Sequence, residues 1–349
     1  MTLEECFGKL PKARNVKNVL LLTHTDLDAA GAYVMTKLVY PNAEVQHCSN
    51  NMMSRVIRNT ILDSATIARY DLILVCDISC SEADAEIINT SSHTSKLVLL
   101  DHHETAMHLN KYNWACVQND IISDCDRIDM YPEGTGHSSG ASLMYDYLCY
   151  CKLMPEDVRE KARKVAFIVS AYDTWDWVTV FNKADNVKDC YNFSLLSRIY
   201  SLGIYEQKLV ENIHDETNTT LYSHDDDLLL SVELGRIQAE LDKAKYYIRT
   251  GNIRFDGKFH SVVFCNENHY MTETFEYMKE NYPGYDYYMM ICGGTISIRT
   301  VGDINAGEFA ARCGGGGHMG AAGVSIPLEK QFERISETLG VDLFVDKKL

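Results

Sequence analysis

The first half of the chain repeats a pattern in which a short apolar run passes directly into acidic or imidazole side chains. Apolar runs within residues 18–32, 70–79 and 96–104 are followed by His24, Asp26 and Asp28, by Asp77, and by Asp101, His102 and His103, respectively. Continuous apolar runs of this length are typical of strands buried on both faces. Helical patterns follow them, as at residues 82–89. The alternation predicts an α/β fold whose N-terminal parallel sheet carries helices on both faces.

A fourth segment, residues 164–177, is apolar and ends in Asp173 and Asp176. Its periodicity fits either a helix or a strand. In parallel sheets covered by helices, ligands bind at the carboxyl ends of the strands. We therefore expect the acids and imidazoles of all four segments to gather at one edge of the sheet.

The second half predicts helices first and then a smaller α/β unit. A polar, turn-rich loop at residues 118–140 precedes a predicted helix at 141–151, and helical spacing over 228–249 is followed by Gly251 as a helix stop. Strands are predicted near 252–255, 261–265, 287–292 and 296–300, with a helix near 272–282. We expect a metal-binding catalytic domain at 1–190, a helical connector at 191–250 and a substrate-binding domain at 251–349.

Composition narrows the class of protein. The net charge of −16 over 349 residues argues against general binding of long nucleic acids, because that affinity comes from Lys and Arg. No apolar run approaches the roughly 18–20 residues of a membrane span, and the N-terminus lacks the apolar core of a signal peptide, so we expect a cytoplasmic protein. Twelve cysteines without a Cys-x-x-Cys pair favour reduced, largely buried thiols over disulfides.

The strand-end residues combine two kinds of metal ligand. Carboxylate oxygens and imidazole nitrogens together suit Mn²⁺, Fe²⁺ or Zn²⁺, and several converging carboxylates repel one another without cations between them. Taken singly, Asp26 and Asp28 fit helix caps and Asp77 fits a turn. Taken jointly at corresponding strand ends, these residues favour a two-metal site with Asp77 able to bridge.

Four consecutive glycines, residues 314–317, precede His318. Glycine loses more backbone entropy on ordering than any other residue, which suggests that the backbone here approaches something closely. One interpretation is a phosphate cradle of backbone amides, with His318 and Arg299 supplying charge-assisted bonds. The alternative is a flexible linker. Trp175 and Trp177 fit a core or a cleft wall, with a base-stacking platform as the alternative.

The ordered motifs THTDLDA, CDIS, LDHHE, AYDTW and RT…GGGGHMGAAG span most of the sequence. The chain resembles the DHH phosphoesterase superfamily with its associated C-terminal substrate-binding domain. The resemblance implies two divalent ions, usually Mn²⁺, held by Asp26, Asp28, Asp77, His102 and Asp173, with Asp77 bridging and His24 a further candidate ligand. Many members place the first histidine four residues before the first Asp, where this chain has Leu22; here His24 stands two before it.

The resemblance also implies roles around the reacting phosphate. Asp77, Asp101 and His103 would form the catalytic group, with Asp101 supporting His102 and His103 facing the scissile phosphate. The residues implied to hold a non-scissile phosphate or nucleotide are Arg299, Gly315, Gly316, Gly317 and His318.

The HTDLD spacing is similar to that of a subgroup of short-RNA hydrolases and cyclic-nucleotide phosphodiesterases. The pyrophosphatase branch has a different second domain, and RecJ-type exonucleases usually carry further nucleic-acid-binding domains. We expect a Mn²⁺-dependent phosphodiesterase that converts short oligoribonucleotides or linear dinucleotides such as pApA to 5′-mononucleotides. The alternatives are a phosphodiesterase for cyclic mono- or dinucleotides and a nucleotide-sequestering binding protein. The sequence is compatible with a homodimer.

Overall fold

The computed structural model describes the chain except residues 50–51, 267–269, 318, 328, 331–332 and 334–349. The predicted substrate residue His318 therefore lies outside the described residues. The chain forms two compact units, Met1–Leu230 and Ser231–Leu349. The division falls within one helix, whereas the sequence suggests boundaries at residues 190 and 250.

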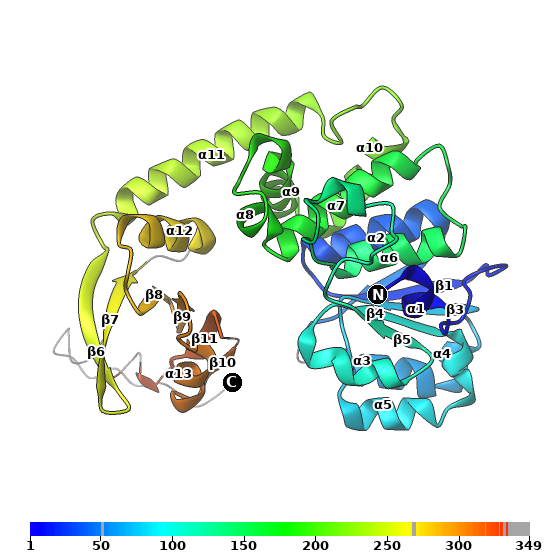
Figure 1. Cartoon of the computed structure of the whole chain (residues 1–349), viewed down its shortest axis with the longest axis horizontal. Helices are drawn as coiled ribbons and strands as arrows, with labels where there is room; N and C mark the ends of the chain where they lie inside the picture. Colours follow the sequence, from blue (N-terminus) through cyan, green and yellow to red (C-terminus); the bar gives the residue numbers. More distant parts are fainter. Residues whose placement is uncertain (50–51, 267–269, 318, 328, 331–332, 334–349) are drawn as a thin grey trace. The chain divides into compact units, whose positions relative to one another are not determined.

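A five-stranded parallel sheet forms the centre of the first unit, with strand order β2-β1-β3-β4-β5 (Figure 1). Every residue of β1, β3, β4 and β5 is buried, as the continuous apolar runs predicted. The strands are β1 (Val19–Thr23), β2 (Glu44–His47), β3 (Leu72–Cys76), β4 (Leu97–Asp101) and β5 (Ala115–Val117). The predicted parallel sheet is confirmed.

Helices cover both faces of this sheet (Figure 1). One face carries α2 (Leu27–Val39) and α6 (Gly140–Tyr150), and the other carries α3 (Met53–Leu62), α4 (Ser64–Ile67) and α5 (Glu82–Asn89). The remaining helices of the unit are α1 (Leu3–Phe7), α7 (Arg159–Asp173), α8 (Asp176–Thr179), α9 (Lys188–Ile199), α10 (Leu202–His214) and the 3₁₀ helices η1 (Ser92–Lys96), η2 (Glu104–Lys111), η3 (Ile128–Met130) and η4 (Asp185–Val187).

The ambiguous fourth segment is helical. Residues Arg159–Asp173 form α7, which packs against α2 and α6 and buries a stripe that includes Ala162, Val165 and Val169. Asp173 is the last residue of α7 and Asp176 the first of α8. The expectation that every acid stands at a strand end is therefore wrong for these two, because α7 buries its apolar residues against helices and not within the sheet.

The second unit begins within α11 (His224–Ala244) and contains a six-stranded sheet of order β10-β11-β9-β8-β7-β6. Among the described strands of this second sheet, β7 and β8 pair in parallel and the other neighbours pair antiparallel. The elements are β6 (Arg249–Phe255), β7 (Lys258–Cys265), α12 (Met271–Asn281), β8 (Tyr287–Cys292), β9 (Thr295–Thr300), α13 (Ala306–Arg312), β10 (Gly316–Gly317) and β11 (Ala321–Ser325). The predicted strands and helix of this region are confirmed.

The predicted helix stop at Gly251 is wrong. The helix ends at Ala244, and Gly251 lies inside β6 opposite Val262 of β7. The side chains of β6 alternate between exposed and half-buried, so this segment follows the period of a strand.

Most of the twelve cysteines are buried, as the sequence predicted. Among the described residues, none of the helices has the length and apolar composition needed to cross a bilayer.

Candidate metal centre

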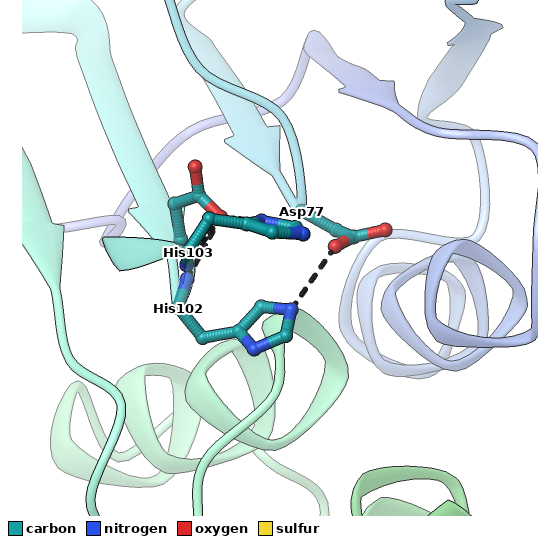
Figure 2. A group of neighbouring side chains, drawn as sticks. Asp77, His102 and His103 are labelled. Atoms are coloured by element: carbon teal, nitrogen blue, oxygen red, sulfur yellow. Dashed lines mark hydrogen bonds and ion pairs between the residues drawn. The ribbon is translucent and has the colours of Figure 1, made fainter. Parts of the chain in front are cut away.

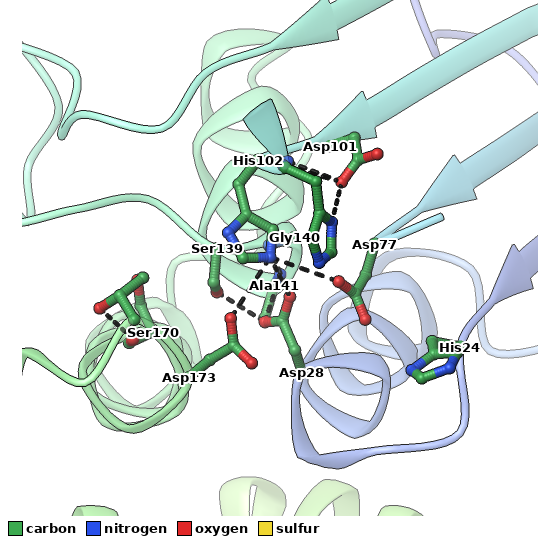
Figure 3. Close-up of polar contacts among 12 residues, drawn as sticks. His24, Asp28, Asp77, Asp101, His102, Ser139, Gly140, Ala141, Ser170 and Asp173 are labelled. Carbon is green, nitrogen blue, oxygen red and sulfur yellow. Dashed lines mark hydrogen bonds and ion pairs between the residues drawn. The ribbon is translucent and has the colours of Figure 1, made fainter. Parts of the chain in front are cut away.

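The carboxyl edge of the parallel sheet collects acids and imidazoles from four separate segments (Figure 3). Asp26 and Asp28 follow β1, Asp77 follows β3, and His102 follows β4, while Asp173 comes from the end of α7. The crossovers of a parallel sheet bring the ends of nonconsecutive strands to one edge.

Asp26 and Asp28 occupy the start of α2 but have different surroundings. Asp26 is the N-cap residue: its Oδ1 accepts from the backbone N of Ala29 at 3.0 Å, and its Oδ2 lies 2.7 Å from His24 Nδ1. Asp26 is thus a helix cap, and it also touches a second candidate ligand. Asp28 is buried, and its contacts lie in another part of the chain.

Asp28 is held by the N-terminus of α6. Its carboxylate accepts hydrogen bonds from Ser139 Oγ at 2.6 Å, Gly140 N at 2.6 Å and Ala141 N at 2.9 Å. The free N–H groups and the dipole at a helix N-terminus stabilise a negative charge. A Cβ on Gly140 would lie only 2.7 Å from Cβ of Asp77, so this position has no room for a side chain.

The His102 ring lies among three carboxylates. Its Nε2 is 3.3 Å from Asp173 Oδ2, 3.4 Å from Asp77 Oδ1 and 4.0 Å from Asp28 Oδ2. Figure 2 shows the contact between His102 and Asp77, and Figure 3 shows the other two acids directed at the same ring. Within the described part of the chain, neither His102 Nε2 nor Asp77 Oδ2 has a hydrogen-bond partner, although both atoms are buried. Buried polar atoms of this kind call for a partner such as an ion.

Burial makes the negative charges of the carboxylates at this site unfavourable unless a cation lies beside them. Burial, and next the charge of Asp28, raise the pKa of the Asp77 carboxyl well above its usual range, and burial raises the pKa of Asp28 and Asp173 as well. Burial lowers the pKa of His102, which favours the neutral imidazole that binds metals. The donor set therefore fits a divalent metal.

Donor atoms from three sets of residues approach within 4.8 Å of one another. The sets are His24, Asp26 and Asp77; Asp28, His102 and Asp173; and Asp77, Asp101, His102 and His103. All six residues predicted as ligands from the sequence thus occur in these sets.

Asp77 follows β3 with a left-handed backbone conformation, φ +60°. Its backbone N donates to the carbonyl of Leu100 at 3.0 Å, which ties the end of β3 to β4. Non-glycine residues in this region of φ/ψ space are costly and concentrate at functional sites. The turn directs the Asp77 carboxylate toward His102.

Asp101 hydrogen-bonds the ring of His103, whereas its hydrogen bond with His102 is to the backbone. Asp101 is fully buried, and its Oδ1 accepts from His103 Nδ1 at 2.7 Å, while its contact with His102 is to the backbone N. The hydrogen bond to Asp101 raises the pKa of His103 to about 9. The reason for the difference is local geometry, since the chain turns after β4 and brings the second imidazole back to the carboxylate.

The predicted substrate residues of the second unit have mainly structural contacts. Arg299 on β9 is half-buried, donates to Ser297 Oγ at 3.3 Å and lies 4.9 Å from the centre of the Phe275 ring. A Cβ on Gly315 would overlap the carbonyl oxygen of Gly323. The glycine tract therefore contributes to β10 and approaches its own neighbouring strand, β11, so it is not a linker.

The sequence analysis did not identify the backbone and hydroxyl donors that hold Asp28, or the pairing of His137. In the structure His137 pairs with Asp176. One available signal was the Ser139-Gly140-Ala141-Ser142 run, because Ser139 and Ser142 form a capping box at the start of α6.

Comparison with known proteins agrees with this architecture. The DHHA1 domain family matches residues 283–340. Oligoribonuclease NrnB of Bacillus subtilis (strain 168) is 27% identical over 331 residues, which cover 92% of this chain and 76% of that protein.

Solved structures show the same fold. The pGpG-specific phosphodiesterase PggH from Vibrio cholerae superposes with a TM-score of 0.50 at 14% identity, covering 92% of this chain and 97% of that one. Exonuclease RecJ bound to manganese gives a TM-score of 0.50 at 15% identity, covering 97% and 94%. The DHH domain of a protein described as a member of a family of ribosomal proteins gives 0.52 at 10% identity, covering 98% and 89%.

The fold and the site define a two-unit α/β protein with an acidic, imidazole-containing centre at the carboxyl edge of a parallel sheet. Residues 283–340 match the DHHA1 domain family, and the whole chain is similar in sequence to NrnB and in fold to PggH and RecJ. These similarities agree with the resemblance indicated by the sequence motifs.

Proposed function

We propose that the protein is a divalent-metal-dependent phosphodiesterase that hydrolyses short oligoribonucleotides, or linear dinucleotides of the pApA type, to 5′-mononucleotides. The observation that carries the proposal is the buried donor cluster around His102 Nε2 and Asp77, two groups with unpartnered atoms among the described residues. The similarity to an oligoribonuclease, and to a phosphodiesterase named for a linear dinucleotide, supports the substrate class.

Two Mn²⁺ ions are the proposed cofactors, since Mn²⁺ suits carboxylate and imidazole ligands. His24 and Asp26 would hold one ion, and Asp28, His102 and Asp173 the other. Asp77 belongs to the first of these groups and also lies 3.4 Å from His102, which supports a bridging role. When bound, such a pair supplies Lewis-acid stabilisation of the phosphoryl group and an activated water.

The protein's own contribution to the reaction centres on His103. Its Nδ1 is bound to Asp101, so Nε2 is the nitrogen left for substrate, and the side chain is 47% exposed. A pKa near 9 keeps the ring positively charged at neutral pH. His103 would therefore donate a hydrogen bond to the phosphoryl oxygen or leaving oxygen, while Asp101 acts as its positioning residue.

Substrate length would be selected by contacts remote from the reacting phosphate. We propose that Arg299, Gly315, Gly316, Gly317 and His318 hold the second phosphate or nucleoside. Burial lowers the pKa of Arg299, but a guanidinium remains charged at neutral pH and suits a phosphate.

The test is product analysis with the purified protein, Mn²⁺ and a panel of pApA, a five-nucleotide RNA, 3′,5′-cyclic AMP, cyclic di-AMP and pyrophosphate. Conversion of pApA and the short RNA to mononucleotides, lost on chelation and restored by Mn²⁺, is the expected result. Selective opening of a cyclic substrate would reassign the enzyme to cyclic nucleotides. Tight binding without turnover would identify a nucleotide-sequestering protein.

Three alanine variants test the site itself. Asp77→Ala, Asp101→Ala and His102→Ala should each abolish turnover while the protein remains folded, as circular dichroism can establish. Unchanged activity in all three would contradict the proposed centre.

A further inference from the structure

A second buried aspartate holds an imidazole in the first unit. Asp176 is fully buried at the start of α8. Its Oδ1 lies 2.7 Å from His137 Nδ1, and its Oδ2 accepts from the backbone N of His137 at 2.8 Å. The His137 side chain is nevertheless 42% exposed. The buried carboxylate of Asp176 thus holds the His137 ring at Nδ1, while part of the ring is exposed to solvent.

This pair repeats the construction of Asp101 and His103. In both pairs a fully buried carboxylate contacts Nδ1 at 2.7 Å and also accepts from the backbone N of the same histidine. The exposed fractions of the two imidazole side chains are similar, 47% and 42%. A carboxylate bound to one ring nitrogen orients the ring and leaves Nε2 for another partner.

The chain on either side of this pair leads into the metal centre. His137 stands two residues before Ser139, which donates to Asp28. Asp176 stands three residues after Asp173, whose Oδ2 lies 3.3 Å from His102 Nε2. The loop before α6 and the turn after α7 are therefore joined through this pair beside the residues proposed to bind metal.

A second set of contacts joins the backbone around His137 to the segment that follows β5. His137 forms an isolated antiparallel bridge with Asp120, and the backbone N of Ser138 donates to the carbonyl of Asn119 at 2.6 Å. The side chain of Asn119 in turn donates to the carbonyl of His102 at 3.3 Å. The backbone of residues 137–138 is thus linked, through the segment after β5, to the backbone of His102.

We propose that His137 is a second substrate-contacting imidazole, which donates from Nε2 to the phosphoryl group being hydrolysed, with Asp176 as its positioning residue. A ring with protons on both nitrogens donates to Asp176 from Nδ1 and to an anionic phosphoryl oxygen from Nε2. The inference rests on the proposed function only in requiring that the substrate be a phosphodiester. Because the contact is to the reacting phosphate, it does not depend on the nucleobase.

The decisive variant is His137→Asn. The Asn side-chain amide reaches about as far as Nδ1 and can keep the hydrogen bond to Asp176, while Nε2 is removed. We expect kcat/KM to fall by about 10²-fold or more on both pApA and bis(p-nitrophenyl) phosphate, with little change in melting temperature or Mn²⁺ affinity. Asp176→Asn should give a smaller loss on the same two substrates.

His93→Ala is the matched control, since His93 lies in η1 before β4, at the opposite end of that strand from Asp101. It should leave turnover unchanged. A purely structural pair gives a different result: His137→Asn keeps near wild-type activity, and His137→Ala loses melting temperature and activity together. That result would overturn the proposal.

Two further measurements separate this inference from the proposed substrate. If the wild type cleaves bis(p-nitrophenyl) phosphate but not pApA, the proposal of a dinucleotide substrate fails. The comparison of His137→Asn with the wild type on bis(p-nitrophenyl) phosphate still tests the role of His137. If the wild type cleaves neither, titration calorimetry of the Mn²⁺-loaded protein with inorganic phosphate decides. Binding weakened about tenfold in His137→Asn supports the contact, and unchanged binding overturns it.

Discussion

Gly140→Ala tests whether the start of α6 positions the proposed metal ligands. Gly140 N donates to Asp28 Oδ2 at 2.6 Å, and a Cβ at this position would lie 2.7 Å from Asp77 Cβ and 2.8 Å from Asp28 Oδ2. Real Cβ contacts lie above 3.0 Å and ordinary van der Waals contact begins near 3.4 Å, so the Asp77 side chain or α6 must move by at least 0.3 Å, and by 0.7 Å to reach ordinary contact. Rotation of the Asp77 side chain cannot relieve the overlap, because Asp77 Cβ and Cα are both in the contact. Asp28 meets the added Cβ with a carboxylate oxygen, which is held by Ser139, Gly140 and Ala141.

The displacement should affect activity far more than stability. A shift approaching 1 Å in a reacting group costs about 10²-fold in rate. Overpacking costs about 1–3 kcal/mol of stability, partly offset by the gain of roughly 0.5–1 kcal/mol from replacing a helical glycine by alanine. We therefore expect kcat for pApA to fall about 10²-fold while the melting temperature changes by only a few degrees.

The assay is steady-state hydrolysis of pApA with Mn²⁺, beside thermal unfolding of the same samples. Gly203→Ala is the control, because Gly203 lies near the start of α10 and its Cβ would meet nothing within 4 Å. It should leave kcat unchanged. A folded Gly140→Ala protein whose kcat stays within about twofold of wild type would refute the claim that this contact sets the geometry of the centre.

Three other contacts of the structure give testable expectations. Asp77→Asn should raise the melting temperature of the chelator-treated protein at neutral pH by about 3 °C or more and abolish the further rise with Mn²⁺, because the carboxylate is buried beside Asp28; calorimetry with and without chelator measures both. A raised folded pKa of Asp77 contributes stability to the wild type that is full below the unfolded value of 3.8 and is lost as the pH rises through the folded value. The advantage of the Asn variant in melting temperature should therefore widen as the pH rises above 3.8. Asp101→Asn should lower the pKa of His103 from about 9 toward 6.5 and cut turnover by about 10²-fold, which NMR titration of the ring and kinetics can measure. Gly315→Ala should destabilise the second unit, because its Cβ would overlap the carbonyl of Gly323, whereas Gly316→Ala, with open space, should be tolerated; thermal melts of the pair would contradict this if both behave alike.

The parts of the site that follow strands could be predicted from the sequence. Fully buried parallel strands have continuous apolar runs, so the abrupt change to Asp77 and Asp101 located the ends of β3 and β4 directly. Asp173 was ambiguous because an apolar run has the same composition in a helix and in a buried strand. Its placement depends on α7 packing against α2 and α6, which is a tertiary contact.

The supporting contacts were hidden because they join distant parts of the chain. Asp28 and the donors that hold it are separated by 111–113 residues, and Asp176 and His137 by 39. No local pattern encodes such pairs in a single sequence. The sequence allows Ser139 to be predicted as the N-cap of α6. It does not show that the N-terminus of this helix stabilises Asp28, which follows β1.

The glycine tract shows that the sequence predicted a close approach of the backbone but not the strand that it approaches. The premise was that ordering several glycines is justified only by a close approach of the backbone. The approach exists at Gly315 and Gly317, but it is to β11, where a Cβ on Gly317 would lie 2.5 Å from the carbonyl of Ala321. Gly316 has open space around its Cα, which makes it the position of the tract best able to meet a ligand.

Function and stability oppose each other at the carboxyl edge of the sheet. The burial of Asp28 and Asp77, which excludes water from the proposed metal site, also raises the pKa of both carboxyls. The fold offsets part of this cost locally, through the α6 N-terminus on Asp28, and leaves Asp77 Oδ2 without a partner among the described residues. Complete neutralisation by protein donors would stabilise the metal-free chain but would occupy the lone pairs that a metal requires. The unpartnered Asp77 oxygen is therefore the feature by which the structure favours metal binding over the stability of the metal-free protein.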